Sequence, residues 1–172
     1  FPGVLDTSFD GDGRRILSPG ENNNVDYIDQ MILLPDGKIA AAGAVDRVMS
    51  LMRFTADLDL DPTFGAGGVV RTGSSISTSA SPTSPGVILE MGREGRLLLA
   101  GSQRIYRYLP NGTLDTLFGS NGQVTLSSAT TVHGLAIQDD GRILVASNTG
   151  VHRLDHDGES VSQIISGQTK GI

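Results

Sequence analysis

One nine-residue phrase occurs three times in this chain of 172 residues, at almost constant spacing. The phrase reads Leu-Asp-x-x-Phe followed by a glycine-containing corner, and its phenylalanines are 55 and 54 residues apart. Self-similarity at a fixed period predicts repeat units that each pack on their neighbours, instead of one deep core. The copies are LDTSFDGDG from Leu5 with Phe9, LDPTFGAGG from Leu60 with Phe64, and LDTLFGSNG from Leu114 with Phe118.

A second phrase recurs between these copies and has the form of a β-hairpin. An apolar stretch meets a tight turn whose glycine supplies positive φ, at Gly37, Gly95 and Gly141, and a short apolar strand follows. These strands do not alternate apolar with polar residues, so we expect both of their faces to be covered. The copies are LLPDGKIAAAG (33–43), MGREGRLLLAG (91–101) and IQDDGRILVAS (137–147).

A third phrase precedes each Leu-Asp motif and predicts another hairpin. Its turn is Asn111-Gly112 in one copy and Asp157-Gly158 in another, whereas Asp57-Leu58 stands there in the first copy. Leucine is disfavoured at positive φ, so we expect that turn to be rearranged. The copies are RFTADLDLD (53–61), RYLPNGTLD (107–115) and RLDHDGESV (153–161).

Four short strands per unit, without helical periodicity, predict an all-β fold. Four-stranded units of this length are typical of a β-propeller-like repeat array, here with three blades, whereas a β-solenoid, the second interpretation, has shorter coils. The last copy lacks the Leu-Asp phrase, which stands alone at the N-terminus, so the units are circularly shifted by one strand. We therefore expect a single repeat domain, 1–172, with approximate blades at 18–70, at 71–126, and at 127–172 plus 1–17.

The shifted ends bear on assembly, because the N-terminal strand would complete the last blade and leave no open sheet edge. Propellers typically have four to eight blades, so three do not close a ring. Either the chain is a piece of a longer array, or two copies form a six-bladed ring in which each donates its first strand to the other. The expected partner is therefore a protein that completes the ring, or a second copy.

Composition excludes several classes of function. Hydrophobic residues make up 38% and aromatic residues 5%, which suits thin, stacked layers. The formal net charge is −6 and Arg14-Arg15 is the one adjacent basic pair, so we expect no nucleic-acid binding. No apolar run approaches the roughly 20 residues of a membrane-spanning helix. The chain has no cysteine, which excludes disulfides and thiolate metal sites.

These phrases resemble the delta-60 repeat family of bacterial proteins, most closely in LLPDGKIAAAG and YRYLPNGTLDTLFG. The resemblance covers nearly the whole chain. It departs from the family pattern at REGR in the second turn phrase, at ADLDLD before Phe64, and at the missing final Leu-Asp phrase. The resemblance implies a propeller-like fold, an extracellular or cell-envelope location, and no defined catalytic activity, active site or cofactor.

The recurring Asp and Arg residues have mainly structural interpretations. Asp6, Asp61 and Asp115 precede the phenylalanines, and each carboxylate is expected to accept hydrogen bonds from the corner that follows it. The recurring Arg53, Arg107 and Arg153 are expected to lie over the sheet and pair with nearby acids. A calcium site is the alternative at Asp6, Asp10 and Asp12, although in the second copy of the phrase glycines replace the last two.

The three histidines do not predict a zinc site. His152 and His156 fall in a hairpin expected at the surface, where they would not converge on one ion. His133 begins the first strand of its unit, and Asp29 and Val87 hold the equivalent positions. If that strand is innermost, Asp29 and His133 face a common channel mouth and could form a binding surface there.

Two functional hypotheses follow from the sequence. The first is a non-catalytic binding or scaffold module, an accessory or adhesive component of a larger extracellular or envelope assembly. The alternative is a ligand-binding or enzymatic propeller whose site forms only in the complete ring, from the loops of several blades.

Overall fold

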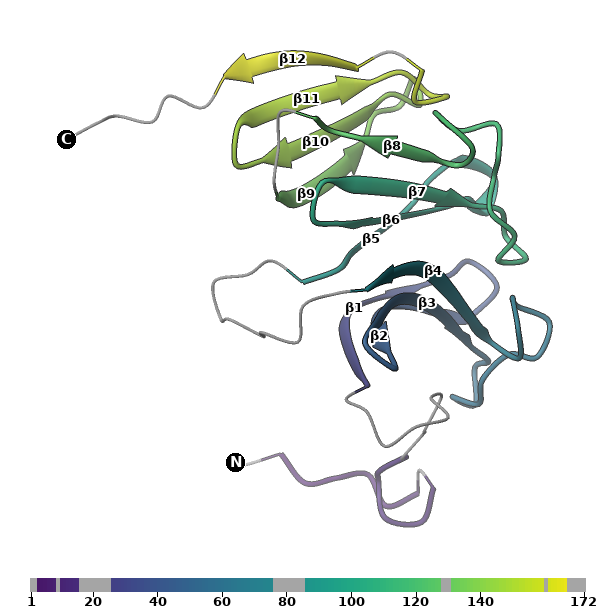
Figure 1. Ribbon diagram of the computed structural model, residues 1–172. Helices are drawn as coiled ribbons and strands as arrows, with labels where there is room; N and C mark the ends of the chain where they lie inside the picture. The colour runs from purple at the N-terminus through teal and green to yellow at the C-terminus, as the bar shows by residue number, and fades with distance from the viewer. Residues whose placement is uncertain are drawn as a thin grey trace.

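Each repeat copy forms its own four-stranded antiparallel sheet, and the three sheets are stacked (Figure 1). The computed structural model describes residues 3–8, 10–15, 26–75, 86–127, 131–159 and 161–166. Apart from one 3-10 turn, η1 (Arg93–Gly95), the regular elements are all strands, as the sequence predicts. They are β1 (Tyr27–Leu33), β2 (Ile39–Val45), β3 (Val48–Phe54), β4 (Val69–Ser75), β5 (Ile88–Met91), β6 (Leu97–Gly101), β7 (Arg104–Tyr108), β8 (Gln123–Thr125), β9 (Val132–Ile137), β10 (Ile143–Ser147), β11 (Gly150–Leu154) and β12 (Val161–Ser166).

Two of the three apolar clusters among the described residues lie between successive sheets, and the third, with Ala41, Met52 and Phe54, lies on the outer side of the first sheet. One apolar cluster joins residues of the first sheet, such as Leu51 and Phe64, to Leu89 of the second sheet. Another joins Phe118 of the second sheet to residues of the third, such as Val145. The second strands of the first two sheets, β2 and β6, are buried along almost their whole length, so the prediction that both faces are covered is confirmed for these two. In the third copy, β10, it is wrong, because Ala146 on the outer face is exposed.

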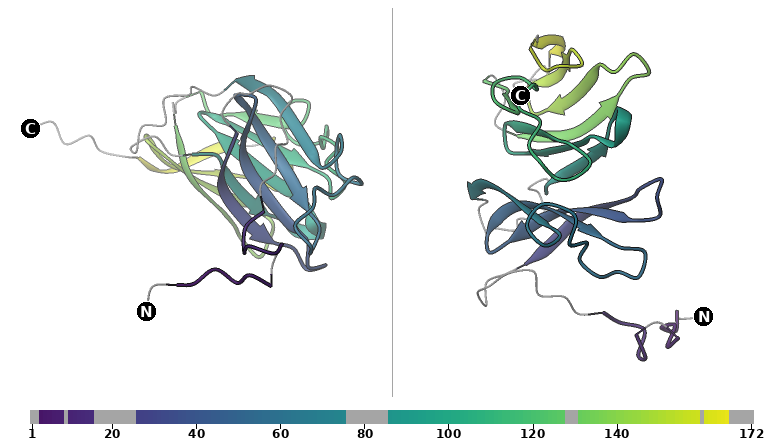
Figure 2. Two further views of the ribbon diagram at one scale, coloured as in Figure 1. Left: turned by 90° about the horizontal axis from the view of Figure 1, so that it is seen from below. Right: turned by 90° about the vertical axis from the view of Figure 1, so that its right-hand side faces the viewer.

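The first strands of the three sheets lie beside one another. The middle first strand, β5, contacts both β1 and β9. Figure 2 shows the same three sheets from two further directions, layered one on the next. In a propeller the first strand lies nearest the axis and the fourth at the rim, and this arrangement follows that order. The all-β, three-bladed propeller-like fold expected from the sequence is confirmed.

The glycines of the tight turns have the positive φ that the sequence predicts, whereas the expectation for the turn at Leu58 fails. Gly37, Gly95 and Gly141 have φ of 81°, 70° and 87°. The expectation of a rearranged turn at Leu58 is wrong, because Leu58 itself adopts φ 62°. Its N–H donates to the carbonyl of Thr55 at 3.0 Å, the bond that glycine makes in the other copies, so backbone hydrogen bonding maintains the turn despite the strained leucine.

The sheets can be set beside the approximate blade boundaries expected from the sequence. The first sheet continues through β4 beyond residue 70, where the sequence places a boundary. In the third sheet β12 holds the fourth position, where the sequence places residues 1–17. The chain after Asp157-Gly158 lacks the Leu-Asp corner and folds straight back along β11, with Leu154 opposite Val161. Completion of that blade by residues 1–17 stays a prediction about more than one copy or a longer array.

Replacing Phe64 by alanine tests whether the corner phenylalanine holds two sheets together. Phe64 is fully buried in the cluster between the first and second sheets, so the change is expected to lower the free energy of unfolding by about 3–5 kcal/mol. Leu117→Ala in the third copy of the same phrase is the matched control, because Leu117 is 80% exposed. Chemical denaturation measures both, and similar losses in the two variants would contradict the assignment.

Candidate functional site

An arginine at the end of β3 links the first blade to the second. Arg53 Nε donates to Asp61 Oδ2 at 2.8 Å, and its guanidinium carbon lies 4.6 Å from the centre of the Phe64 ring. One terminal nitrogen donates to Thr63 Oγ1 at 3.0 Å, and the other donates to the backbone carbonyl of Pro110 in the second blade. The guanidinium is therefore held by a carboxylate and an aromatic face of its own blade while it bonds the next one.

The same arrangement recurs between the second and third blades. Arg107 Nε donates to Asp115 Oδ2 at 2.8 Å, and its guanidinium carbon lies 4.5 Å from the Phe118 ring centre. A terminal nitrogen donates to the carbonyl of His156 in the third blade. Each of these two blades thus contributes an Arg-Asp-Phe triad that bonds the turn of the blade that follows, and we call this set of contacts the inter-blade lock.

The turn glycine of the following blade provides the surface on which the phenylalanine rests. A Cβ atom added at Gly112 would lie 3.0 Å from the Phe64 ring, and one added at Gly158 would lie 2.7 Å from the Phe118 ring. The backbone also bonds across this contact, because Gly65 N–H donates to the carbonyl of Asn111 at 3.0 Å. A side chain at the turn would push the two blades apart.

A second cation completes each lock. Lys38 Nζ lies 2.9 Å from Asp61 Oδ2, and Arg96 Nε lies 3.3 Å from Asp115 Oδ2 without hydrogen-bond geometry. Burial alone would raise the pKa of Asp61, but hydrogen bonds from Lys38 and Thr63 and the charge of Arg53 together bring that pKa well below its usual range. The carboxylate therefore stays ionised at any pH near neutrality.

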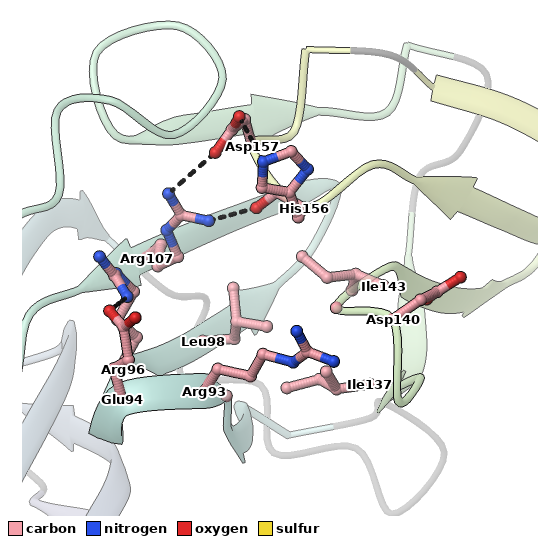
Figure 3. A pocket seen from close by; sticks show the side chains of 12 residues that line it. Arg93, Glu94, Arg96, Leu98, Arg107, Ile137, Asp140, Ile143, His156 and Asp157 are labelled. Atoms are coloured by element: carbon pink, nitrogen blue, oxygen red, sulfur yellow. Dashed lines mark hydrogen bonds and ion pairs between the residues drawn. The ribbon is translucent and has the colours of Figure 1, made fainter.

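Beside the second lock is a hollow of about 310 Å³ between the second and third blades (Figure 3). Its apolar floor is made by Leu98, Ile137 and Ile143, and its rim comes from three turns. The turns contribute both signs of charge, namely Arg93, Glu94 and Arg96 from the second blade and Asp140, His156 and Asp157 from the third, with Arg107 between them.

The charged groups of this hollow are largely paired with one another. Arg96 is paired with Glu94, His156 Nε2 lies 2.8 Å from Asp157, and Arg107 serves the lock. The twelve lining residues include no serine, threonine, cysteine or tyrosine, so among them there is no hydroxyl or thiol nucleophile.

The predicted channel-mouth residues lie on the first strands but are not brought together. Asp29 is on β1 and His133 is on β9, both exposed, with β5 between these two strands. Asp29 Oδ2 accepts the Val87 N–H at 2.8 Å, so this carboxylate ties the first blade to the start of the second. A joint binding surface of Asp29 and His133 stays a prediction.

The three carboxylates considered for calcium are turned to local partners. Asp6 Oδ1 accepts the N–H and the hydroxyl of Ser8, at 3.0 and 2.6 Å. Asp10 Oδ1 lies 3.4 Å from Arg15, and Asp12 Oδ1 accepts the N–H of Arg14 at 2.9 Å. Among the described residues no three acidic or histidine side chains group as a metal site would require. Phe9, the first of the recurring phenylalanines, lies outside the described residues.

Sequence reasoning missed two features of this region. His152, expected at the surface, is 2% exposed, and its Nε2 lies 3.0 Å from Ser147 Oγ. The register of β10 and β11 places it on the face toward the second blade, which its residue type did not reveal. The hollow was missed because its lining residues come from turns of two different blades, which are far apart in the sequence and belong to different copies of the repeat. Long apolar helices that could span a membrane do not occur in the part of the chain described.

Comparisons with known proteins agree with this fold. Residues 34–64 and 95–118 match a family described as a β-propeller domain of unknown function, DUF5122, which supports a β-propeller repeat family. No curated protein matches the chain.

Two solved structures resemble the chain in fold. A protein of unknown function from Bacteroides caccae is similar with a TM-score of 0.51 and 17% identity, over 79% of this chain and 44% of that one. A protein described as a candidate gluconolactonase is similar with a TM-score of 0.51 and 20% identity, over 81% of this chain and 48% of that one. The chain therefore spans less than half the length of either, and identities this low show the fold alone.

Replacing Asp61 by asparagine tests the charge state of the first lock. The change leaves Arg53 and Lys38 without a carboxylate and is expected to cost about 3 kcal/mol of unfolding free energy at pH 7. Since the pKa of Asp61 is lowered by folding, its contribution is fully present above the ordinary value of 3.8 and is lost as the pH falls below it. The difference between parent and variant should therefore shrink below pH 4.

The control for this titration is Asp139→Asn, at an exposed position of the third blade. Denaturation is followed for the parent and both variants between pH 7 and about pH 3. A cost of Asp61→Asn that is the same at both ends of this range would show that the ion pairs do not stabilise the lock.

Proposed function

We propose that the chain is a non-catalytic propeller-type binding module that associates with other blades through the two end faces of its stack. It would serve as an accessory or adhesive component of a larger extracellular or envelope assembly. The observation that carries the proposal is the exposure, at both ends, of certain apolar positions whose equivalents beside a neighbouring blade are buried or partly buried. Other apolar residues on the outer side of the first blade, such as Ala41 and Met52, are already buried.

The first end face is the outer side of the first blade. Met31 and Leu33 of β1 are 61% and 72% exposed. Strand pairing gives them the same register as Leu89 and Met91 of β5, since Leu33 pairs with Ile39 as Met91 pairs with Leu97. Leu89 is fully buried against the first blade and Met91 packs beside it. Met31 and Leu33 therefore face the position of a preceding blade.

The second end face is the outer side of the third blade. Ala146 of β10 is exposed, whereas its equivalent in β6, Ala100, is fully buried against the third blade. The strand at the rim adds further apolar surface. Val161, Ile164 and Ile165 of β12 are 45%, 45% and 59% exposed. An array that ends in solvent usually carries polar capping surfaces, and contiguous apolar surface marks an interaction site.

The charged groups support a binding role over a catalytic one. Arg53, Arg107, Asp61 and Asp115 are used to join blades, and the hollow beside Arg107 presents charges that already neutralise one another. The enzymatic alternative requires acids or histidines that converge at the axis. Asp29 is the acid that the sequence places at the channel mouth, and its carboxylate accepts a hydrogen bond from the next blade.

The finer family assignment is part of the same proposal. The repeat phrases favour the delta-60 type, in which the recurring positions serve turns and packing and leave the loops free to bind. An extracellular or envelope location goes with that assignment.

Replacing both Met31 and Leu33 by glutamate tests the first end face. Charging two apolar positions that a neighbouring blade would bury is expected to weaken association at least about tenfold, because burial of each side chain contributes about 1.5–3 kcal/mol. Mass is measured by sedimentation equilibrium across a concentration series, since the monomer is 18.0 kDa.

Leu117→Glu is the control for this variant, because Leu117 is also strongly exposed but lies in the corner of the second blade instead of on an end face. Equal weakening by both variants would contradict a specific end face. If the parent chain keeps a mass of 18.0 kDa at protein concentrations up to about 1 mM, where even very weak association is detected, the proposed function itself is contradicted.

A further inference from the structure

The two ends of the chain each carry half of an inter-blade lock. The third blade has Arg153 at the position of Arg53 and Arg107, but Val161 stands eight residues later, where the other blades have their aspartate. The N-terminal phrase has Asp6 in the position of Asp61 and Asp115, but among the described residues its carboxylate bonds Ser8 and has no cation partner. Among the described residues, Arg153 therefore has no carboxylate partner and Asp6 has no cation partner.

The N-terminal half is already folded into the shape that the lock uses. Asp6 Oδ1 accepts the N–H and hydroxyl of Ser8 at 3.0 and 2.6 Å. Asp61 Oδ1 accepts the N–H and hydroxyl of Thr63 at 3.0 and 2.7 Å. These two corners therefore have the same local hydrogen bonds, although only the second belongs to a complete sheet.

The bend that closes the corner is the same in both copies as well. Gly13 and Gly68 have φ of 78° and 95°. A Cβ atom added at Gly13 would lie 2.7 Å from Leu5 Cβ, and one added at Gly68 would lie 2.9 Å from Leu60 Cβ. Because the corner is preformed, binding it to a blade would cost little ordering entropy.

The third blade presents the complementary charges. Arg153 is exposed and makes no recorded ion pair with the described residues, whereas the side chains of Arg53 and Arg107 are 10% and 11% exposed. Arg142 holds the position of Lys38 and Arg96, the second cations of the other locks. It pairs with Asp140 of its own turn at 2.5 Å. Arg153 and Arg142 thus hold the positions of the two cations that pair with one aspartate in each complete lock.

We infer that the N-terminal corner of one copy binds the third blade of a second copy, with Asp6 placed between Arg153 and Arg142 as the carboxylate of a third lock. This inference rests on the proposed function and identifies its partner as a second copy of this chain. Within one chain the two halves lie at opposite ends of the stack, so they do not meet (Figure 1). Reciprocal binding by two copies gives six blades, within the range of closed propellers.

Binding in this position exchanges one rim strand for another. In the complete locks the aspartate N–H donates to the arginine carbonyl at 2.9 Å, for Asp61 to Arg53 and for Asp115 to Arg107. In the third blade, β12 pairs along this edge instead, with Ser162 opposite Arg153. All five β12 residues with a described exposure, 161–165, are exposed, so displacing the strand breaks hydrogen bonds that the incoming corner restores and exposes little buried surface.

A charge exchange tests the inference directly. Asp6→Lys places like charges at the junction with Arg153 of the second copy, and Arg153→Glu places like charges at the junction with Asp6. Each variant alone is expected to associate about 30-fold or more weakly than the parent, because like charges in such a contact cost several kcal/mol. Both positions are exposed, so the blades are expected to fold as in the parent, while Asp6→Lys also removes the two Ser8 hydrogen bonds of the corner.

The mixture of the two variants gives the decisive measurement. In an equimolar mixture, one junction joins Asp6 of the Arg153→Glu chain to Arg153 of the Asp6→Lys chain. At the other junction the introduced lysine meets the introduced glutamate but also the unchanged Arg142, so this junction is only partly restored. The mixture is therefore expected to associate at least about tenfold more tightly than either variant alone, without reaching the parent value. Asp12→Lys is the control, with the same change of charge in the same corner, and it should leave association near the parent value.

Comparing the association of the parent with that of the mixture distinguishes a failure of the Asp6–Arg153 contact from a failure of the proposed function. A parent chain that associates, combined with a mixture that stays as weak as its components, would overturn the Asp6–Arg153 contact and leave the end-face proposal standing. A loss with Asp12→Lys equal to that with Asp6→Lys would also overturn the contact, because the effect would then follow net charge alone. A parent chain that stays monomeric would overturn both.

Discussion

The stack depends on a guanidinium group that serves two blades at once. In each complete lock the arginine is fixed by its own aspartate and by the face of its own phenylalanine, and its remaining nitrogen reaches a backbone carbonyl of the next blade. Arginine suits this role better than lysine, because its planar fork can bond in several directions while it stacks on an aromatic ring. The cost of burying the charge is offset within the same contact.

Small side chains make this contact possible. In the strand β2, Ala40 and Ala42 are fully buried against the second blade, and their small size allows the two sheets to approach closely. Thin sheets of this kind bury little apolar surface by themselves, so each blade depends on its neighbours for stability. The few large anchors, such as Phe64 and Phe118, then account for much of the packing between blades.

The sequence revealed the local parts of this structure better than the contacts between them. Repeated glycines and apolar runs predicted the strands and turns, because each depends on neighbours in the sequence. The role of Arg53 as a link between blades could not be read, since its bond partner, the carbonyl of Pro110, carries no side-chain signal. The position of β12 was also missed, because a polar stretch without the corner motif can still pair with an available strand edge.

Each lock takes its triad from one blade and its turn from the next, so the stack has a direction. A repeat carries the triad on one side and the receiving turn on the other. Copying one repeat within the gene would therefore create a new junction without any new interacting residue. Arrays of this kind can lengthen or shorten by whole blades while every remaining junction is preserved, and the number of blades is then limited by the angle between neighbours instead of by the chemistry that joins them.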